Sequence, residues 1–183
     1  MNIIKTELKD CFIIEPRIFN DERGYFFESF NERTFAEKTG LNVHFVQDNQ
    51  SFSSKGVLRG LHYQTGEYAQ AKLVQVLQGE VLDVAVDIRP ESETYGKYVA
   101  VLLTSENKKQ FFVPRGFAHG FLVLSETALF AYKCDNFYNK ESEGGIVFDD
   151  KTIGIEWNFP KEKLIISEKD QYNPTLEKAK KVW

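Results

Sequence analysis

The sequence of 183 residues is poor in several residue types, and each shortage excludes a class of protein. It contains two cysteines, three histidines and one methionine. Cys11 and Cys134 lie far apart without CxxC or Cys/His spacing, so we expect two free thiols rather than a zinc site or a disulfide framework. No apolar run approaches the ~18 residues of a membrane span, and the N-terminus lacks the apolar core of a signal peptide. We therefore expect a soluble, cytoplasmic protein with no membrane partner.

The sequence also has no excess of basic over acidic residues. The 27 acidic residues outnumber the 23 lysines and arginines, which gives a formal net charge of −4. No global field favours nucleic acid, so any polyanionic ligand must be held by local cations. The length predicts one domain over residues 1–183.

Aromatic residues are plentiful, with 16 phenylalanines among them. With β-branched residues and regularly spaced glycines they favour strands over helices. We predict an all-β protein, a β-sandwich or barrel with a few short helices. Strands are expected at 11–15, 25–30, 72–77, 81–88, 98–104, 109–113, 127–132 and 146–149, with a hairpin at Gly79. A helix is expected from Asn31 to Gly40, and the tail 174–183 is expected to be a peripheral, short basic helix.

The stretch from Gly56 to Gln64 concentrates the chemistry. In a strand Gly60, His62 and Gln64 share one face, with Arg59 beside them, and Lys72 follows within one hairpin's distance. Histidine is the usual general base near neutral pH. A buried structural histidine fits this pattern equally well.

A metal site is disfavoured by the same stretch. Metal-binding barrels of the cupin type use a His-x-His pair, and His62-Tyr63-Gln64 supplies only one histidine. His62 and His119 can still meet in space, although the cations nearby would repel a metal ion. A carboxylate such as Asp170 can orient His62 as a base without metal, but spacing alone does not establish that pairing.

Several motifs in order resemble one family along nearly the whole chain. They are Arg59-Gly60-Leu61-His62-Tyr63-Gln64, Val86-Asp87-Ile88-Arg89, Pro114-Arg115-Gly116-Phe117-Ala118-His119-Gly120-Phe121 and Ser167-Glu168-Lys169-Asp170. Together they closely resemble the dTDP-4-dehydrorhamnose 3,5-epimerase family. The resemblance implies a homodimeric cupin-type jelly roll without metal or cofactor. It would bind a dTDP-linked 4-keto-6-deoxy sugar and invert C3 and C5 of dTDP-4-dehydro-6-deoxy-D-glucose to give dTDP-4-dehydro-L-rhamnose.

The resemblance also implies roles for individual residues. His62 matches the family base, Asp170 its orienting carboxylate, Lys72 the cation at the C4 oxygen and Tyr132 the proton donor on the opposite face. Phe26 and Tyr138 match aromatics that sandwich thymine. The remaining positions that match the family's nucleotide-sugar binding set, some of them supplied by the partner subunit, are Arg23, Glu28, Gln47, Asn49, Arg59, His119, Glu143 and Lys169.

Other functions stay open at this stage. A C5-only or C3-only epimerase or a ketoisomerase would use the same fold, and Tyr132 disfavours the C3-only case. A sugar-binding or regulatory cupin should lack a member of the acid–base set, and none is missing here. A metal-dependent cupin oxygenase would carry bound metal.

Overall fold

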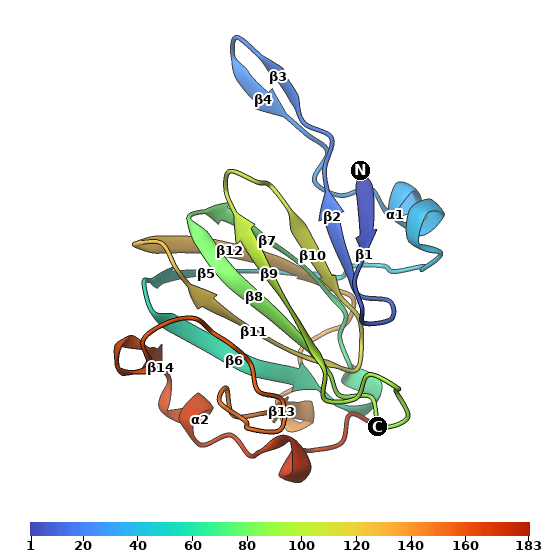
Figure 1. Ribbon diagram of the computed structural model, residues 1–183. Coiled ribbons are helices and arrows are strands. Elements are labelled where there is room, and N and C mark those ends of the chain that lie inside the picture. Colours follow the sequence, from blue (N-terminus) through green and yellow to red (C-terminus); the bar gives the residue numbers. More distant parts are fainter.

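The structure, a computed structural model, describes residues 1–183 as a sandwich of two antiparallel sheets (Figure 1). In spatial order, the first sheet comprises β1 (Asn2–Lys5), β2 (Phe12–Glu15), β10 (Gln110–Val113), β7 (Lys72–Gln78), β12 (Thr127–Cys134) and β5 (Gln47–Ser54). The second comprises β13 (Glu143–Gly145), β6 (Val57–Gln64), β11 (Phe117–Val123), β8 (Glu80–Asp87) and β9 (Tyr98–Thr104), and β14 (Ile165–Ile166) runs parallel to β6. The all-β prediction is confirmed, and the architecture is a cupin-like jelly roll.

One hairpin and the two α-helices lie outside the two sheets. The hairpin of β3 (Phe19–Asp21) and β4 (Gly24–Phe26) projects away from the sandwich (Figure 1). Helix α1 (Glu32–Thr39) lies beside β1 and β2, and the short helix α2 (Glu168–Gln171) lies below β6. Neither helix has the length and apolar character needed to cross a membrane.

The main core lies between the sheets, because inward-facing residues of both are apolar. Val74, Phe111, Phe121 and Phe130 belong to this cluster. A second cluster covers the outer face of the second sheet, where Leu58 and Val84 contact residues from the C-terminal segment such as Trp157. The C-terminal segment is thereby fixed against the back of β6.

The predicted helix near residue 35 is confirmed. The Asn31 side chain accepts a hydrogen bond from the Thr34 amide at 3.0 Å, which satisfies a free donor at the helix start. Gly40 ends the helix with φ of 76°, a left-handed conformation that glycine adopts without strain. Phe35 is fully buried and anchors the helix.

The predicted hairpin at Gly79 is wrong. Strand β7 pairs with β10 and β12, whereas β8 pairs with β11 and β9, so Gly79 links the two sheets. Strand β8 is buried on both faces: Val81 and Ala85 contact the main core, and Val84 contacts the outer cluster. Because both faces of β8 are buried, the sequence pattern does not indicate which strands pair with it.

Three further boundaries differ from the prediction. The strand expected over 25–30 ends at Phe26, where the chain leaves the projecting hairpin. The strand expected over 146–149 is absent, and β13 at Glu143–Gly145 precedes it. The tail 174–183 contains only a 3₁₀ turn, Leu176–Lys178, and otherwise follows the protein surface. Its apolar side chains make tertiary contacts that an isolated amphipathic helix would not require.

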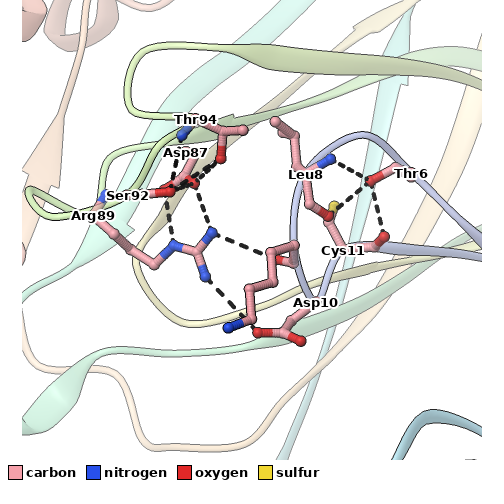
Figure 2. A network of polar contacts seen from close by, with 9 residues as sticks. Thr6, Leu8, Asp10, Cys11, Asp87, Arg89, Ser92 and Thr94 are labelled. Atoms are coloured by element: carbon pink, nitrogen blue, oxygen red, sulfur yellow. Dashed lines mark hydrogen bonds and ion pairs between the residues drawn. The ribbon is translucent and has the colours of Figure 1, made fainter.

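A buried polar network braces the end of β8 (Figure 2). The Asp87 carboxylate is fully buried and accepts hydrogen bonds of 2.6 Å from Arg89 Nη2, Ser92 Oγ and Thr94 Oγ1. Burial alone would raise the pKa of Asp87. The hydrogen bonds from these donors lower it by more, so the pKa lies below its ordinary value. The network fixes the connection between β8 and β9 as well as the guanidinium of Arg89, which lies 4.0 Å from the Asp10 carboxylate.

Both cysteines are free thiols, as predicted, and both are buried. No group of three or more histidine, cysteine, aspartate or glutamate side chains lies close enough to hold a metal ion.

Candidate active site

A cavity of about 510 Å³ opens between the two sheets. A second hollow of about 290 Å³ adjoins it, since His62, Lys72 and Tyr132 line both. The walls come from β5, β6, β7, β11 and β12 and from the C-terminal segment around α2. The four residues to which the sequence resemblance assigns catalysis therefore meet at one place, because Asp170 also lines the larger hollow.

Glycine at position 60 allows β6 to approach β11 closely enough to form this wall. Gly60 has φ of 126°, and a β-carbon there would stand 2.6 Å from the Gly120 α-carbon. On the same face, His62 lies directly opposite His119 of β11. The Arg-Gly-Leu-His motif thus places a histidine at the cavity by bringing two backbones together.

His62 is held by a carboxylate from the far end of the chain. His62 Nε2 lies 2.6 Å from Asp170 Oδ1, and the Gly60 amide donates to Asp170 Oδ2 at 3.2 Å. Burial raises the pKa of Asp170, while the His62 contact and the Gly60 amide lower it, and the net pKa lies below the ordinary value. Because an ionised carboxylate only accepts hydrogen bonds, Nε2 is the donor in this contact, and in the neutral imidazole Nδ1 is then the nitrogen with a free lone pair.

Lys72 and Tyr132 belong to the sheet opposite His62. The Lys72 ammonium lies 5.8 Å from the centre of the Tyr132 ring and makes no ion pair. Burial lowers the pKa of Lys72 and raises that of Tyr132, because it disfavours the charged form of each group. The cavity thus has a histidine–carboxylate pair on one wall, with a phenol and an unpaired amine on the other.

The smaller hollow contains an ordered polar set. Glu143 forms an ion pair of 2.6 Å with Lys169 and accepts a hydrogen bond from the Tyr138 hydroxyl at 3.3 Å. Burial raises the pKa of Glu143, but its bonds with Lys169 and Tyr138 lower it below the ordinary value. Gln47 accepts from the Tyr138 amide at 3.2 Å and donates to Asn49 at 3.1 Å.

Arg59 and His119 contact the larger hollow. Arg59 Nε donates to the Ser53 hydroxyl at 3.1 Å, so its terminal nitrogens remain available to a ligand. His119 Nε2 lies 2.8 and 3.0 Å from the two carboxylate oxygens of Asp83, which is fully buried. Of the ten residues predicted to bind the substrate, seven surround the cavity of their own chain: Gln47, Asn49, Arg59, His119, Tyr138, Glu143 and Lys169.

The other three, Arg23, Phe26 and Glu28, lie in or just after the projecting hairpin. Phe26 is 70% exposed, and Arg23 forms an ion pair of 2.5 Å with Asp21. None of the three lines the cavity of its own chain. Their part in substrate binding stays a prediction.

Sequence reasoning missed several residues of the cavity wall. Ser51 is the most informative, because its buried hydroxyl has no hydrogen-bond partner. It follows Gln47 and Asn49 at two-residue spacing on β5 and faces the same side, so extending the amide pattern along the strand would have found it. Asp83 does not line the cavity, but it holds His119 from the neighbouring strand β8, a contact between strands that the sequence does not show.

Comparison with known proteins gives a consistent result. A sequence profile described as dTDP-4-dehydrorhamnose 3,5-epimerase matches residues 5–178. The enzyme of that name from Shigella flexneri is 58% identical over 170 residues, which cover 93% of each chain. The crystal structure of the Elizabethkingia anophelis NUHP1 enzyme of that name is 63% identical, with a TM-score of 0.94 and 97% of each chain covered. A Legionella pneumophila Philadelphia 1 dTDP-6-deoxy-D-glucose-3,5-epimerase, in complex with dTDP-4-keto-L-rhamnose, is 51% identical, with a TM-score of 0.93 over 97% of this chain and 93% of that one.

The fold, the cavity and these similarities define an isomerase built on a cupin-like jelly roll. Within that class the assignment is narrower, because the profile spans almost the entire chain. The chain belongs to the dTDP-4-dehydrorhamnose 3,5-epimerase family.

Proposed function

We propose that the protein inverts C3 and C5 of dTDP-4-dehydro-6-deoxy-D-glucose to give dTDP-4-dehydro-L-rhamnose, with His62 as base, Tyr132 as acid and no metal ion. The observation that carries the proposal is the placement of His62 and Tyr132 on opposite walls of one cavity. Inversion at carbon requires a proton to leave from one face and return to the other. Two groups on facing walls meet this requirement, whereas a single acid–base group returns the proton to the face that it left.

The first half-reaction removes a proton next to the ketone. Nδ1 of His62 takes the proton from C5 or C3, and the electron pair of the broken C–H bond forms the enolate with its charge on the C4 oxygen. Asp170 stabilises the imidazolium that results through its 2.6 Å contact with Nε2. A C–H bond beside a carbonyl is too weakly acidic for imidazole unless the enolate is stabilised.

Lys72 is the group that supplies this stabilisation. Its ammonium has no carboxylate partner, and burial lowers its pKa. A developing negative charge on the C4 oxygen gives the ammonium the partner that it lacks in the free protein. The enolate carbon then takes a proton from the Tyr132 hydroxyl on the opposite face, which leaves a phenolate and an imidazolium. Proton exchange with solvent returns Tyr132 to the phenol and His62 to the free base, and the same sequence at the second carbon then completes the double inversion.

Metal independence is supported by the pairing of the carboxylates. Asp170 is bonded to His62 and Gly60. Glu143 is bonded to Lys169 and Tyr138, and the buried Asp83 carboxylate to His119. Each of these acidic side chains already has a donor. The unpaired Lys72 adds a positive charge that would oppose a divalent cation.

The projecting hairpin supports a homodimer in which residues are shared. Phe19, Tyr25 and Phe26 are 50%, 58% and 70% exposed there, an unusual arrangement for a free surface. Because Arg23, Phe26 and Glu28 do not reach the cavity of their own chain, we propose that they complete the site of the partner subunit. The cytoplasmic location expected from the sequence stays a prediction.

The test is incubation with dTDP-4-keto-6-deoxyglucose in deuterated water, followed by NMR. The proposal predicts solvent deuterium at both C3 and C5 and the L-configured product. Deuterium and inversion at only one of these carbons would replace it with a single-position epimerase, and a product with a moved carbonyl would indicate a ketoisomerase. Full activity in His62→Ala would refute the assignment of the base.

The role of Tyr132 has a separate test. Tyr132→Phe removes only the hydroxyl, so proton abstraction by His62 continues while donation on the opposite face stops. We expect the variant to exchange the substrate's α-hydrogen with solvent while forming less than about 1% of the wild-type yield of inverted product. Normal inversion in Tyr132→Phe would contradict the assignment.

A further inference from the structure

Neither the resemblance nor the proposed chemistry assigns a role to the C-terminal tail, residues 174–183. It is nevertheless fixed firmly to the protein. Val182 is fully buried, and its carbonyl oxygen accepts a hydrogen bond of 2.7 Å from the Gly66 amide. Leu176 is also buried, and its amide donates to Asp150 at 2.8 Å. The residues between these two anchors are thus held along the edge of the second sheet.

Lys180, between the anchors, contacts the strand that carries Glu143. Its ammonium donates to the carbonyl oxygen of Glu141 at 2.9 Å and to that of Glu143 at 3.3 Å. Its own carbonyl oxygen accepts a hydrogen bond of 2.5 Å from the Tyr63 hydroxyl. Lys180 therefore joins β13 to β6 from outside the cavity.

Strand β13 needs such a contact because it is a three-residue edge strand. It pairs only with β6, where Glu143, Gly144 and Gly145 lie opposite Gln64, Tyr63 and His62. Short edge strands have few hydrogen bonds of their own and open easily. The Tyr63 ring packs directly against Gly144, where an added β-carbon would collide with the ring. Tyr63 of β6 thus contacts both the tail, through Lys180, and β13, through Gly144.

Glu143 transmits the position of β13 to the cavity. Its carboxylate is bonded to Lys169 and Tyr138, which come from two different segments of the chain. A shift of β13 would move this carboxylate and release both partners. Gly145 pairs with His62 along the backbone, but the side-chain hydrogen bond between His62 and Asp170 includes no atom of β13 or of Lys180 and would keep both of its partners.

We propose that Lys180 is a positioning residue, which holds β13 in register with β6 so that Glu143, Lys169 and Tyr138 are ordered for the nucleotide-linked substrate. The inference rests on the proposed function, since it identifies the nucleotide part of the same substrate as the ligand of this wall. Substrate binding and proton transfer then depend on different walls of the cavity. The tail controls how tightly the substrate is bound, and the His62 wall controls the chemistry.

The test compares Lys180→Met with Lys181→Met in the full-length protein. Both variants lose one positive charge at neighbouring exposed positions, but only Lys180 bonds to β13. We expect Lys180→Met to raise KM for the dTDP-linked keto sugar about fivefold to tenfold, the effect of losing hydrogen bonds from a charged donor. Its kcat should stay within about twofold of wild type, as should both constants of Lys181→Met. A KM for Lys180→Met equal to that of Lys181→Met would overturn the inference.

A double-mutant cycle separates positioning from general loosening. If Lys180 acts through Glu143, Lys180→Met should raise KM little further in a Glu143→Gln background. An equal rise in both backgrounds, or a fall in kcat as large as the rise in KM, would instead show a structural defect and refute the proposal. Lys180→Arg keeps the charge and the donors, so it should recover most of the wild-type KM.

The two proposals fail in distinguishable ways. If wild-type protein neither exchanges the substrate hydrogens nor inverts the sugar, the proposed function fails. If wild type is active and Lys180→Met matches it, only the role of Lys180 fails. Calorimetric binding of dTDP alone gives an independent measurement, in which Lys180→Met should weaken the affinity by a similar factor.

Discussion

The pairing of His62 with Asp170 makes Asp170→Asn the most informative single substitution. The change adds almost no volume, and the carbonyl oxygen of the new side-chain amide can still accept the hydrogen bond from the Gly60 amide. The side-chain NH₂ then faces Nε2 of His62, where the carboxylate accepted at 2.6 Å. To accept from that NH₂, Nε2 must give up its proton, which moves to Nδ1. The nitrogen that serves as the base is thereby blocked.

The expected loss follows from the burial of this pair. The Asp170 side chain is 5% exposed, so water cannot replace it as the partner of the imidazolium formed during proton abstraction. An asparagine in the equivalent position of a serine protease triad, where the same tautomer argument holds, lowers kcat about 10,000-fold. Because His62 is 33% exposed, we expect a smaller loss here, about 100- to 10,000-fold in kcat, or about 3 to 5 kcal/mol of transition-state stabilisation.

The assay is the initial rate of deuterium incorporation at C3 and C5, with KM measured in parallel. KM should change by less than about threefold, since Asp170 acts on His62 rather than on the substrate. Glu168→Gln, at an exposed position two residues earlier, is the control and should match wild type. A loss in kcat below about tenfold in folded Asp170→Asn protein would refute the assignment of Asp170 as the orienting carboxylate.

Three further predictions address other parts of the molecule. Lys72→Met should lower kcat about 100- to 1,000-fold with little change in KM, because it removes the positive charge at the enolate oxygen, and single-turnover rates of α-hydrogen exchange would check this. Ser51→Ala should raise KM about threefold to tenfold, because the buried hydroxyl has no partner in the free protein and can bond to the substrate. The melting temperature should not fall. An unchanged KM would mean that the hydroxyl does not contact the substrate. Asp87→Asn should lower the free energy of unfolding at pH 7 by about 2 to 4 kcal/mol in denaturant titrations. The Asp87 pKa is lower in the folded than in the unfolded protein, so the folded wild type binds fewer protons. The difference in free energy of unfolding between wild type and Asp87→Asn should therefore be full above about pH 5 and shrink below about pH 4.

The sequence predicts most of the local structure because the local signals are strong. Asn31 and Gly40 carry the chemistry of helix ends, and the helix lies between them. The strands over 98–104 and 110–113 follow from apolar runs with turn residues on both sides. The neighbours of each strand are not encoded locally. Val81 and Val84 face opposite sides of β8 and both are buried, so the pattern did not show that Gly79 joins two different sheets.

The candidate site divides in the same way. The cluster of Arg59, Gly60 and His62 is visible in one short stretch. Alternation alone would put Arg59 and His62 on opposite faces, and both line the cavity where the register between β6 and β11 shifts, which the sequence pattern does not show. The pairing of His62 with Asp170 spans 108 residues and was available only from the resemblance. Ser51 and Asp83 were missed because serine and aspartate are ordinary residues in isolation, and each gains significance only from the side chains that the fold places beside it.

The distance along the chain between His62 and Asp170 has a consequence for how the protein loses activity. The carboxylate is carried by a segment that borders the cavity beside β6, and β14 attaches to β6 by only two residues. Such a segment can open while the sandwich stays folded, because local opening requires less free energy than global unfolding. Detachment of residues 165–171 would separate the base from its carboxylate without exposing the main core. In mild denaturant, catalysis should therefore fade before the spectroscopic unfolding of the sheets, which makes enzymatic rate a reporter on the docking of this segment.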